Sequence, residues 1–164
     1  MNKTYHLNNA ITLNTTSEKY DAVAIPTNAA EIKKHRHQFR EFNFSQSIKD
    51  GFTVYKICRE DDENILQGLV AAKPSTGFLE CANMEVNDFN KSPVSMYNGV
   101  GKCMIALCCK ISFDIGFGGY IAFFAKNHLM RYYKRYGAKN LYGLRMFIDD
   151  ESAKKLIDLY FKKS

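Results

Sequence analysis

The sequence predicts an α/β (α+β) protein whose mixed, mostly antiparallel central sheet is flanked by helices. Three observations support this. Residues 52–86 hold three consecutive strand-like runs separated by short turns. A glycine-punctuated turn at 98–102 opens a run with helical apolar spacing, and strand-like and helical runs alternate after residue 115. Of the 164 residues, 46 % are hydrophobic. This suits a single domain over residues 1–164 with one core.

The first fifty residues give weak signals. Residues 1–20 are rich in Asn and Thr, so we expect a loose edge strand or an irregular arm. Residues 22–26 can form a short strand. Residues 28–42 combine an Asn start with helix-compatible side chains, which predicts a helix.

Three strands are expected next. Residues 52–59 alternate apolar and polar side chains, the pattern of a half-buried strand. The acidic segment 60–64 reads as a turn and 65–73 as the partner strand of a hairpin. A second turn at 74–77 leads into a third strand over 78–86.

A helix and a central strand follow a polar loop. Residues 102–115 carry apolar residues at helical spacing, and the glycine-rich segment 116–119 ends that helix. The mostly apolar run 120–125 suits a central strand. The strand–helix–strand step through 78–125 should be a right-handed parallel crossover.

The C-terminal part predicts one more strand between two helices. Asn127 is expected to cap a helix over 129–136. A last strand is expected over 141–148. An extra C-terminal helix over 150–162 is expected to start from Asp149 or the residue after it.

The sequence argues against a membrane-spanning protein, a secreted protein and a disulfide-bonded or metal-binding protein. No apolar run approaches the roughly 18 residues that cross a bilayer. The first residues lack the apolar segment of a secretory signal, so we expect a cytoplasmic protein. The five cysteines are odd in number and form no C-x-x-C pair, so we expect buried thiols, no disulfide framework and no metal site.

The charge distribution favours an anionic partner. The formal net charge is +6, and residues 115–148 contain no Asp or Glu. A surface of one sign attracts phosphates, either of a nucleic acid or of a small cofactor. The basic residues of this segment are Lys126, Arg131, Lys134, Arg135, Lys139 and Arg145.

The turn Asn98-Gly99-Val100-Gly101-Lys102 has the features of an anion site. Glycines let the backbone approach an anion closely. The unpaired N–H groups and the dipole of the following helix point to the same place. The turn therefore predicts a phosphate-binding helix N-terminus.

Two common glycine-loop families do not match this turn. A P-loop requires Gly at 96 and Ser or Thr at 103, where this chain has Met96 and Cys103. A dinucleotide fingerprint requires Gly at 104 and an acidic residue about 20 positions later. Met104 occupies that position, and no acidic residue follows at that spacing.

A third family fits better. The segment 96–101 (M-Y-N-G-V-G) resembles the GNAT signature, in which Gln or Arg, two residues, Gly, one residue, and Gly or Ala open a helix. GNAT proteins are acyl-CoA-dependent N-acyltransferases. The apolar run 120–125, Asn127 and the segment 133–137 (Y-K-R-Y-G) resemble the second motif of that superfamily. The resemblance covers residues 78–138 well and the earlier strands loosely.

Three features depart from the family pattern. Met96 replaces the Gln or Arg of the signature. The passage 86–96 takes about twice the usual number of residues, which indicates a local insertion. The helix expected over 150–162 replaces the usual terminal strand.

The resemblance implies a site for acetyl-CoA as co-substrate. Asn127 would contact the pantetheine or help to position the next helix. Three residues would pair through their backbone with the pantetheine arm: Met84, Glu85 and Val86. Six backbone amides would hold the pyrophosphate: Asn98, Gly99, Val100, Gly101, Lys102 and Cys103.

The resemblance also implies catalytic candidates. Tyr133 matches the tyrosine that protonates the departing thiolate in many GNAT members. Glu80 is the candidate general base, because some members carry their catalytic glutamate near this position. Glu85 is its rival, and strand alternation is expected to place the two side chains on opposite faces. A chain of water molecules is the third alternative.

The expected activity is transfer of an acetyl group from acetyl-CoA to a primary amine of an unidentified acceptor. Two alternatives stay open: a CoA-binding domain without catalysis, and a basic nucleic-acid-binding module that uses residues 126–145. The second lacks a recognisable nucleic-acid-reading motif. No membrane partner is expected, and dimerisation through the terminal strand and helix is left open.

Overall fold

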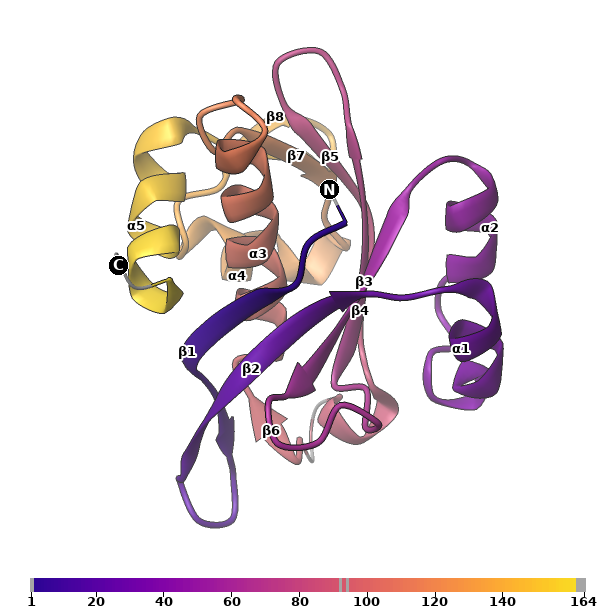
Figure 1. Ribbon diagram of the computed structural model, residues 1–164. Helices are drawn as coiled ribbons and strands as arrows, with labels where there is room; N and C mark the ends of the chain where they lie inside the picture. Colours follow the sequence, from indigo (N-terminus) through magenta and orange to yellow (C-terminus); the bar gives the residue numbers. More distant parts are fainter. Residues whose placement is uncertain (1, 92, 94, 162–164) are drawn as a thin grey trace.

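The computed structural model describes residues 2–91, 93 and 95–161. These residues form a nine-stranded sheet with the order β6-β1-β2-β3-β4-β5-β7-β9-β8. The β5–β7 pair is parallel, and the other neighbouring strands are antiparallel. Helices cover both faces (Figure 1). The predicted fold class is confirmed.

The elements have the following bounds. The strands are β1 (Tyr5–Leu13), β2 (Lys19–Pro26), β3 (Thr53–Arg59), β4 (Gly68–Pro74), β5 (Leu79–Val86), β6 (Tyr97–Asn98), β7 (Ile121–Phe124), β8 (Lys139–Tyr142) and β9 (Arg145–Ile148). The helices are α1 (Ala29–Lys34), α2 (Phe44–Lys49), α3 (Val100–Asp114), α4 (Met130–Lys134) and α5 (Asp150–Tyr160). Short 3-10 turns occupy η1 (Arg36–Gln38), η2 (Asp88–Asn90) and η3 (Asn127–Leu129).

The sheet separates two apolar clusters. The larger lies between the sheet and helices α3 and α5, and all five cysteines of the chain are buried, four of them in this cluster. The smaller lies beneath α1 and α2 on the other face. Figure 1 shows the two helix pairs on opposite sides of the sheet. Burial of this apolar surface is the main stabilising contribution to such a fold.

The N-terminal segment is a regular part of the sheet rather than an irregular arm. Strand β1 pairs with β2, and Leu7 and Ile11 are fully buried. The register shifts between these two residues, and Asn9 there has a φ of 48° and donates its N–H to Asp21. This irregularity interrupts the apolar alternation, so the sequence pattern is weak.

The helix predicted over 28–42 is shorter, and a second helix follows it. Asn28 caps α1 as expected, by accepting the N–H of Glu31. The chain then forms the 3-10 turn η1. A second helix, α2, begins after Asn43, whose side chain accepts the N–H of Gln46. The α2 helix was not predicted.

Two predictions in the C-terminal third are wrong. The strand expected over 141–148 is a hairpin of β8 and β9, because Gly143 turns the chain with a φ of 48°. Asn127 does not cap α4, since it starts the turn η3 and Leu129 occupies the cap position. The final helix is confirmed over 150–160, and residue 162 lies outside the described part.

The start of α5 offers a test of local stability. Asp149 accepts the N–H of Ser152 at 2.9 Å and a hydrogen bond from Lys139 at 2.7 Å. The bond from Lys139 lowers the pKa of Asp149 most, and the bond from Ser152 lowers it further. We expect Asp149→Ala to cost about 1 kcal/mol of stability in urea denaturation, whereas Asp149→Asn should retain most of the cap. Equal losses in both variants would contradict the capping role.

Within the described residues, no helix has the length and the hydropathy needed to span a membrane.

Candidate cofactor site and active site

A cleft opens where two parallel strands part. β5 pairs with β7 at Leu79–Ile121 and Glu80–Ala122, and beyond these pairs the strands diverge. The cleft has a volume of about 530 Å³. Its walls come from the end of β5, the loop after it, the start of α3, and the segment from η3 to α4. The backbone of Met84–Val86 thus borders an open space on its β7 side.

A bulge in β5 changes which side chains share a face. Ala71 of β4 pairs with Asn83 and Ala72 with Cys81, so Ala82 is an extra residue in β5. Before the bulge, Leu79 and Cys81 face the larger cluster. An extra residue shifts the alternation by one position.

The bulge corrects one prediction. After it, Met84 and Val86 pack against the larger cluster, while Asn83 bonds Ser47 of α2 on the other face. Glu80 and Glu85 therefore lie on the same face of the sheet, that of α1 and α2. The predicted opposite orientation is wrong because it assumed an unbroken alternation.

The glycine turn has the geometry of a helix-start anion site. Gly99 holds the cap position of α3 with a φ of 93°, and a Cβ there would lie 2.9 Å from the carbonyl oxygen of Ala10. A Cβ on Gly101 would lie 3.3 Å from the hydroxyl of Tyr132. Among the described residues, no side chain caps this end of α3. Its first amides therefore point into the cleft with the positive end of the helix dipole.

The structure brings most of the predicted cofactor residues together. Seven of them line the same cleft: Met84, Glu85, Val86, Asn98, Gly99, Val100 and Gly101. Strand and helix start thus line one common space.

Lys102 and Cys103 do not line this cleft. The Lys102 ammonium lies over the ring of Tyr136, 5.0 Å from its centroid, so only the backbone amide of Lys102 faces the turn. The amide of Cys103 bonds the carbonyl of Gly99 at 3.0 Å, as an interior helical amide does. Its thiol is fully buried and donates to Ala10, and burial raises its pKa to about 12. Cys103 therefore has no free donor for a phosphate.

Two tyrosines of α4 line the cleft. The Tyr133 ring packs edge-on against Phe123 of β7, with centroids 4.9 Å apart. Burial raises the pKa of the Tyr133 phenol. Tyr132 also lines the cleft, and its hydroxyl lies beside the glycine turn. The sequence singled out Tyr133, and the structure adds Tyr132 as a neighbour nearer to the helix start.

Exposed cations lie on the same segment that supplies Tyr132 and Tyr133 to the cleft. Arg131, Lys134 and Arg135 are exposed in or directly after α4 and make no ion pair within the described part of the chain. His128, which lines the cleft, is also exposed. The backbone of Asn127 lies in η3, and its side chain is outside the described part. These cations suit the phosphates of a nucleotide.

Glu80 is held in an ion pair. Arg145 of β9 donates two hydrogen bonds to its carboxylate, each 2.6 Å long. The bond with Glu80 is the main cause that raises the pKa of Arg145, so the guanidinium stays charged. Glu80 is not among the residues that line the cleft. This arrangement does not favour the predicted role of Glu80 as general base.

The loop after β5 is an ordered insertion in its described part. Asn87 and Asn90 are buried, and both bond the segment before β4: Asn87 donates to Leu66, and Asn90 to Gln67. The loop carries Lys91 into the cleft. Sequence reasoning missed Glu41, Lys91 and Tyr132 as cleft residues, since no motif marks them.

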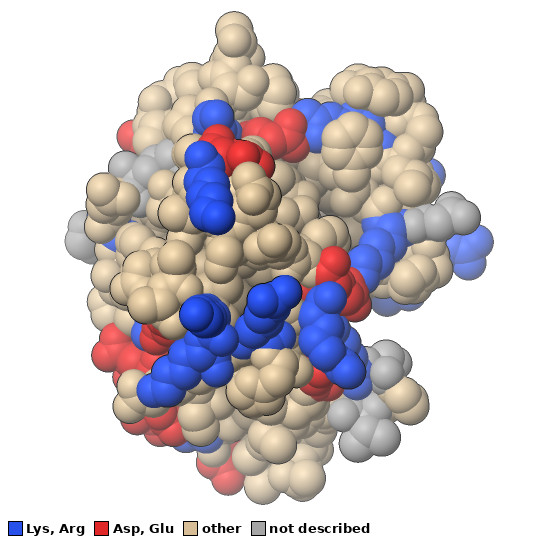
Figure 2. Space-filling view, turned by 90° about the vertical axis from the view of Figure 1, so that its right-hand side faces the viewer, with Lys and Arg blue, Asp and Glu red and all other residues tan. Residues whose placement is uncertain are grey.

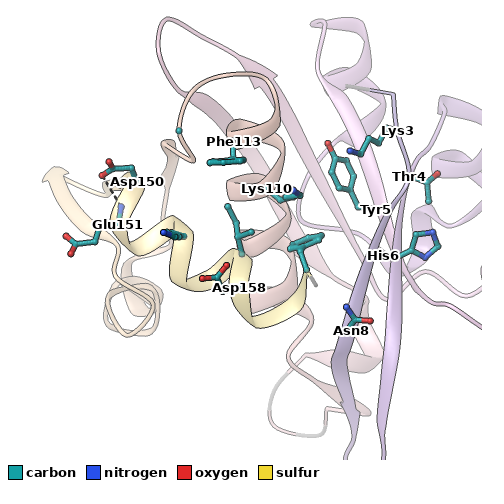
Figure 3. Close-up of a pocket in the computed structure, with 14 residues that line it drawn as sticks. Lys3, Thr4, Tyr5, His6, Asn8, Lys110, Phe113, Asp150, Glu151 and Asp158 are labelled. Carbon is teal, nitrogen blue, oxygen red and sulfur yellow. Dashed lines mark hydrogen bonds between the residues drawn. The ribbon is translucent and has the colours of Figure 1, made fainter. Parts of the chain in front are cut away.

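A larger groove lies elsewhere. It has a volume of about 1230 Å³ and runs between the start of β1 and helices α3 and α5 (Figure 3). Its lining residues include both lysines (Lys3, Lys110 and Lys154) and acids (Asp150, Glu151 and Asp158), so the charges are mixed. None of the predicted site residues lines this groove. The described residues also contain no cluster of side chains that could hold a metal ion.

Lys and Arg side chains form a band across the face that α1 and α2 cover, next to a hollow in the surface (Figure 2). In the segment around η1, Lys33, Lys34, Arg36 and Arg40 are exposed. The basic surface is therefore wider than the segment 115–148 that the sequence singled out.

No protein-family model and no curated protein sequence matches the chain. Solved structures do match in fold. The AtaTR complex bound with acetyl-CoA has a TM-score of 0.59 at 16 % identity, over 82 % of this chain and 97 % of the other. A Bacillus subtilis acetyltransferase in complex with CoA has a TM-score of 0.53 at 13 % identity, over 78 % and 97 %.

A third similar structure is the KacTA–DNA complex, with a TM-score of 0.52 at 16 % identity, over 77 % of this chain and 81 % of the other. The chain has the fold of the GNAT acetyltransferases.

Proposed function

We propose that this chain is an N-acetyltransferase that transfers the acetyl group of acetyl-CoA to a primary amine by direct attack. One observation carries the proposal: within the described residues, the edge of β5 that β7 leaves unpaired after Glu80 and the uncapped start of α3 border the same cleft. An extended pantetheine arm needs a strand edge, and a pyrophosphate needs free amide donors. The fold supports the same assignment.

The cofactor would lie across this cleft in two parts. The pantetheine arm would pair with the backbone of Met84–Val86 like an added strand. The pyrophosphate would lie at Gly99, Val100 and Gly101, within reach of the amide of Lys102. Arg131 and the cations after it would attract the remaining phosphate.

The reaction needs one bond to form and one to break. The amine nitrogen attacks the thioester carbonyl carbon, an amide forms, and the carbon–sulfur bond breaks. The departing thiolate takes a proton from Tyr133, whose burial keeps the phenol protonated at neutral pH. The proton of the amine leaves through a base or through water.

Glu80 can be tested directly as that base. Because both of its oxygens bond Arg145, we expect Glu80→Gln to lose stability, by about 2 kcal/mol, through the unpaired guanidinium. The pH–rate profile of the variant should keep the shape of the wild-type profile. Loss of the acidic limb of that profile would restore Glu80 as the general base.

Release of the CoA thiol tests the proposed function. Purified protein is mixed with acetyl-CoA and a panel of primary amines, and free thiol is followed by a chromogenic reagent. Amine-dependent release supports an acetyltransferase. Cofactor binding without release would identify a non-catalytic CoA-binding domain.

The band of exposed cations keeps a nucleic-acid-binding module as the second candidate. Fluorescence anisotropy with a labelled short duplex tests it. Salt-sensitive duplex binding together with no affinity for acetyl-CoA would favour that module over the enzyme.

A further inference from the structure

The cleft contains a buried carboxylate that the proposed reaction does not use. The side chain of Glu85 is 1 % exposed. It accepts the backbone N–H groups of Glu41 and Phe42 at 3.2 Å and the ammonium of Lys91 at 2.8 Å. A buried charge is costly unless such partners compensate it. This carboxylate therefore joins three segments: strand β5, segment 40–42 and the loop after β5.

The contact holds segment 40–42, which connects η1 to α2. Within the described residues, the N–H groups of Glu41 and Phe42 both donate to Glu85. The backbone of this segment thus depends on one side chain of β5. The same strand borders the proposed cofactor path along its β7 side.

Segment 40–42 in turn reaches across the mouth of the cleft. Glu41 lines the cleft, forms an ion pair with Lys91 at 3.3 Å, and pairs with Lys126 from the far side, directly after β7. Arg40 pairs with Asp88 of the inserted loop at 2.9 Å. The segment therefore links the two strands that part at the cleft.

Lys91 provides the positive charge in the contact between Glu85 and segment 40–42. Burial alone would lower the pKa of Lys91, but its hydrogen bonds to Glu85 and Asp88 outweigh burial and raise it. The ammonium stays charged and compensates the buried carboxylate. Its position depends on the insertion after β5, so this insertion and segment 40–42 meet at Glu85.

We propose that Glu85 is a positioning residue for the side of the cleft where the acceptor amine would enter, which lies on the α1–α2 face of the sheet, away from the proposed phosphate site at the start of α3. Its carboxylate fixes segment 40–42 on this acceptor side, while the backbone of its strand serves the cofactor side. The proposal rests on the proposed acetyltransferase function. It gives the side chain of Glu85 a role other than that of general base. Loss of the carboxylate should loosen the acceptor side and leave cofactor binding nearly unchanged.

Glu85→Gln is the main test variant, because it keeps the shape of the side chain and removes the most buried of the three carboxylates that pair with Lys91. We expect the KM for 1,4-diaminobutane to rise about tenfold, since Lys91 loses its bond to a buried charge and the two backbone N–H groups then donate to a neutral oxygen instead of a charged one. The Kd for acetyl-CoA, measured by calorimetry, should stay within about threefold of the wild-type value. Hydrogen exchange in a peptide covering residues 39–44 should become faster.

Glu31→Gln is the matched control. Glu31 is another carboxylate paired with a lysine, Lys56 at 2.8 Å, on the same face of the sheet, although it is less buried than Glu85. It does not line the cleft. We expect this variant to lower the Tm. The ratio of KM for the amine to Kd for acetyl-CoA and the rate of hydrogen exchange in residues 39–44 should not change.

A second variant keeps the proposal testable if Glu85→Gln unfolds. Lys91→Met leaves the Glu85 carboxylate on its two amides, so exchange in residues 39–44 should rise less than in Glu85→Gln and more than in Glu31→Gln. Unchanged exchange in every variant would overturn the proposal, as would equal changes in KM and Kd. Failure of the proposed function shows separately, as no thiol release by the wild-type protein.

Discussion

Replacing Tyr133 with phenylalanine is expected to lower kcat by about 100-fold or more, the contribution typical of a positioned general acid. The variant loses the phenolic proton and keeps the ring that packs on Phe123. Folding and acetyl-CoA binding should therefore change little. Steady-state kinetics with a fixed amine, together with calorimetry, measure both quantities.

The pH dependence gives a second readout of Tyr133. A general acid works only while protonated, and burial raises the pKa of this phenol above its usual 10. The activity that depends on Tyr133 should therefore persist through neutral pH and fall only as the pH rises through the raised pKa.

Tyr132→Phe is the matched control, since Tyr132 lines the same cleft and its hydroxyl lies at the glycine turn. We expect it to affect acetyl-CoA binding more than kcat. If Tyr133→Phe kept wild-type turnover while Tyr132→Phe lost it, the acid would be Tyr132.

Gly99→Ala should impair both the fold and the cofactor site. The residue has a φ of 93°, and its new Cβ would lie 2.9 Å from the Ala10 carbonyl oxygen, which belongs to the backbone and has little freedom to move. We expect a loss of about 1–3 kcal/mol in denaturation and a weaker affinity for acetyl-CoA. Movement of β1 away from α3 would displace the amides of the turn.

Gly77→Ala separates backbone strain from this clash. Gly77 has a φ of 80° in an exposed turn, and no atom lies within 4 Å of the place that a Cβ would occupy. It should show the cost of the positive φ alone and bind acetyl-CoA as the wild type does. Equal stability losses at the two glycines would show that contact with Ala10 is unimportant.

The parts of the fold with an uninterrupted pattern could be predicted from the sequence. The helix after the glycine turn and the strand over 52–59 follow one period over enough residues to be recognised, whereas the bulge at Ala82 breaks the period of the strand over 78–86. The β1 strand could not be predicted with the same clarity, because its irregularity at Asn9 breaks the alternation. The turn at Gly143 divides into two strands what the sequence pattern presents as one.

The candidate site shows the same limit at the level of single residues. Backbone donors at Gly99 and Gly101 could be predicted, because glycines at this spacing indicate a turn with a positive φ and close approach of the backbone to a ligand. The orientation of Glu80 relative to Glu85 could not, since the extra residue Ala82 leaves no mark in the pattern. Lys91 and Glu41 meet only through the tertiary fold.

Calorimetric titration with acetyl-CoA and with acetyl-pantetheine, which lacks the nucleotide and its phosphates, tests the central claim most directly. We predict one site per chain for acetyl-CoA, with an affinity that falls as salt rises, and binding of acetyl-pantetheine that is weaker by about 100-fold. Absence of heat with acetyl-CoA, or equal affinities for the two thioesters, would contradict a phosphate site at the start of α3.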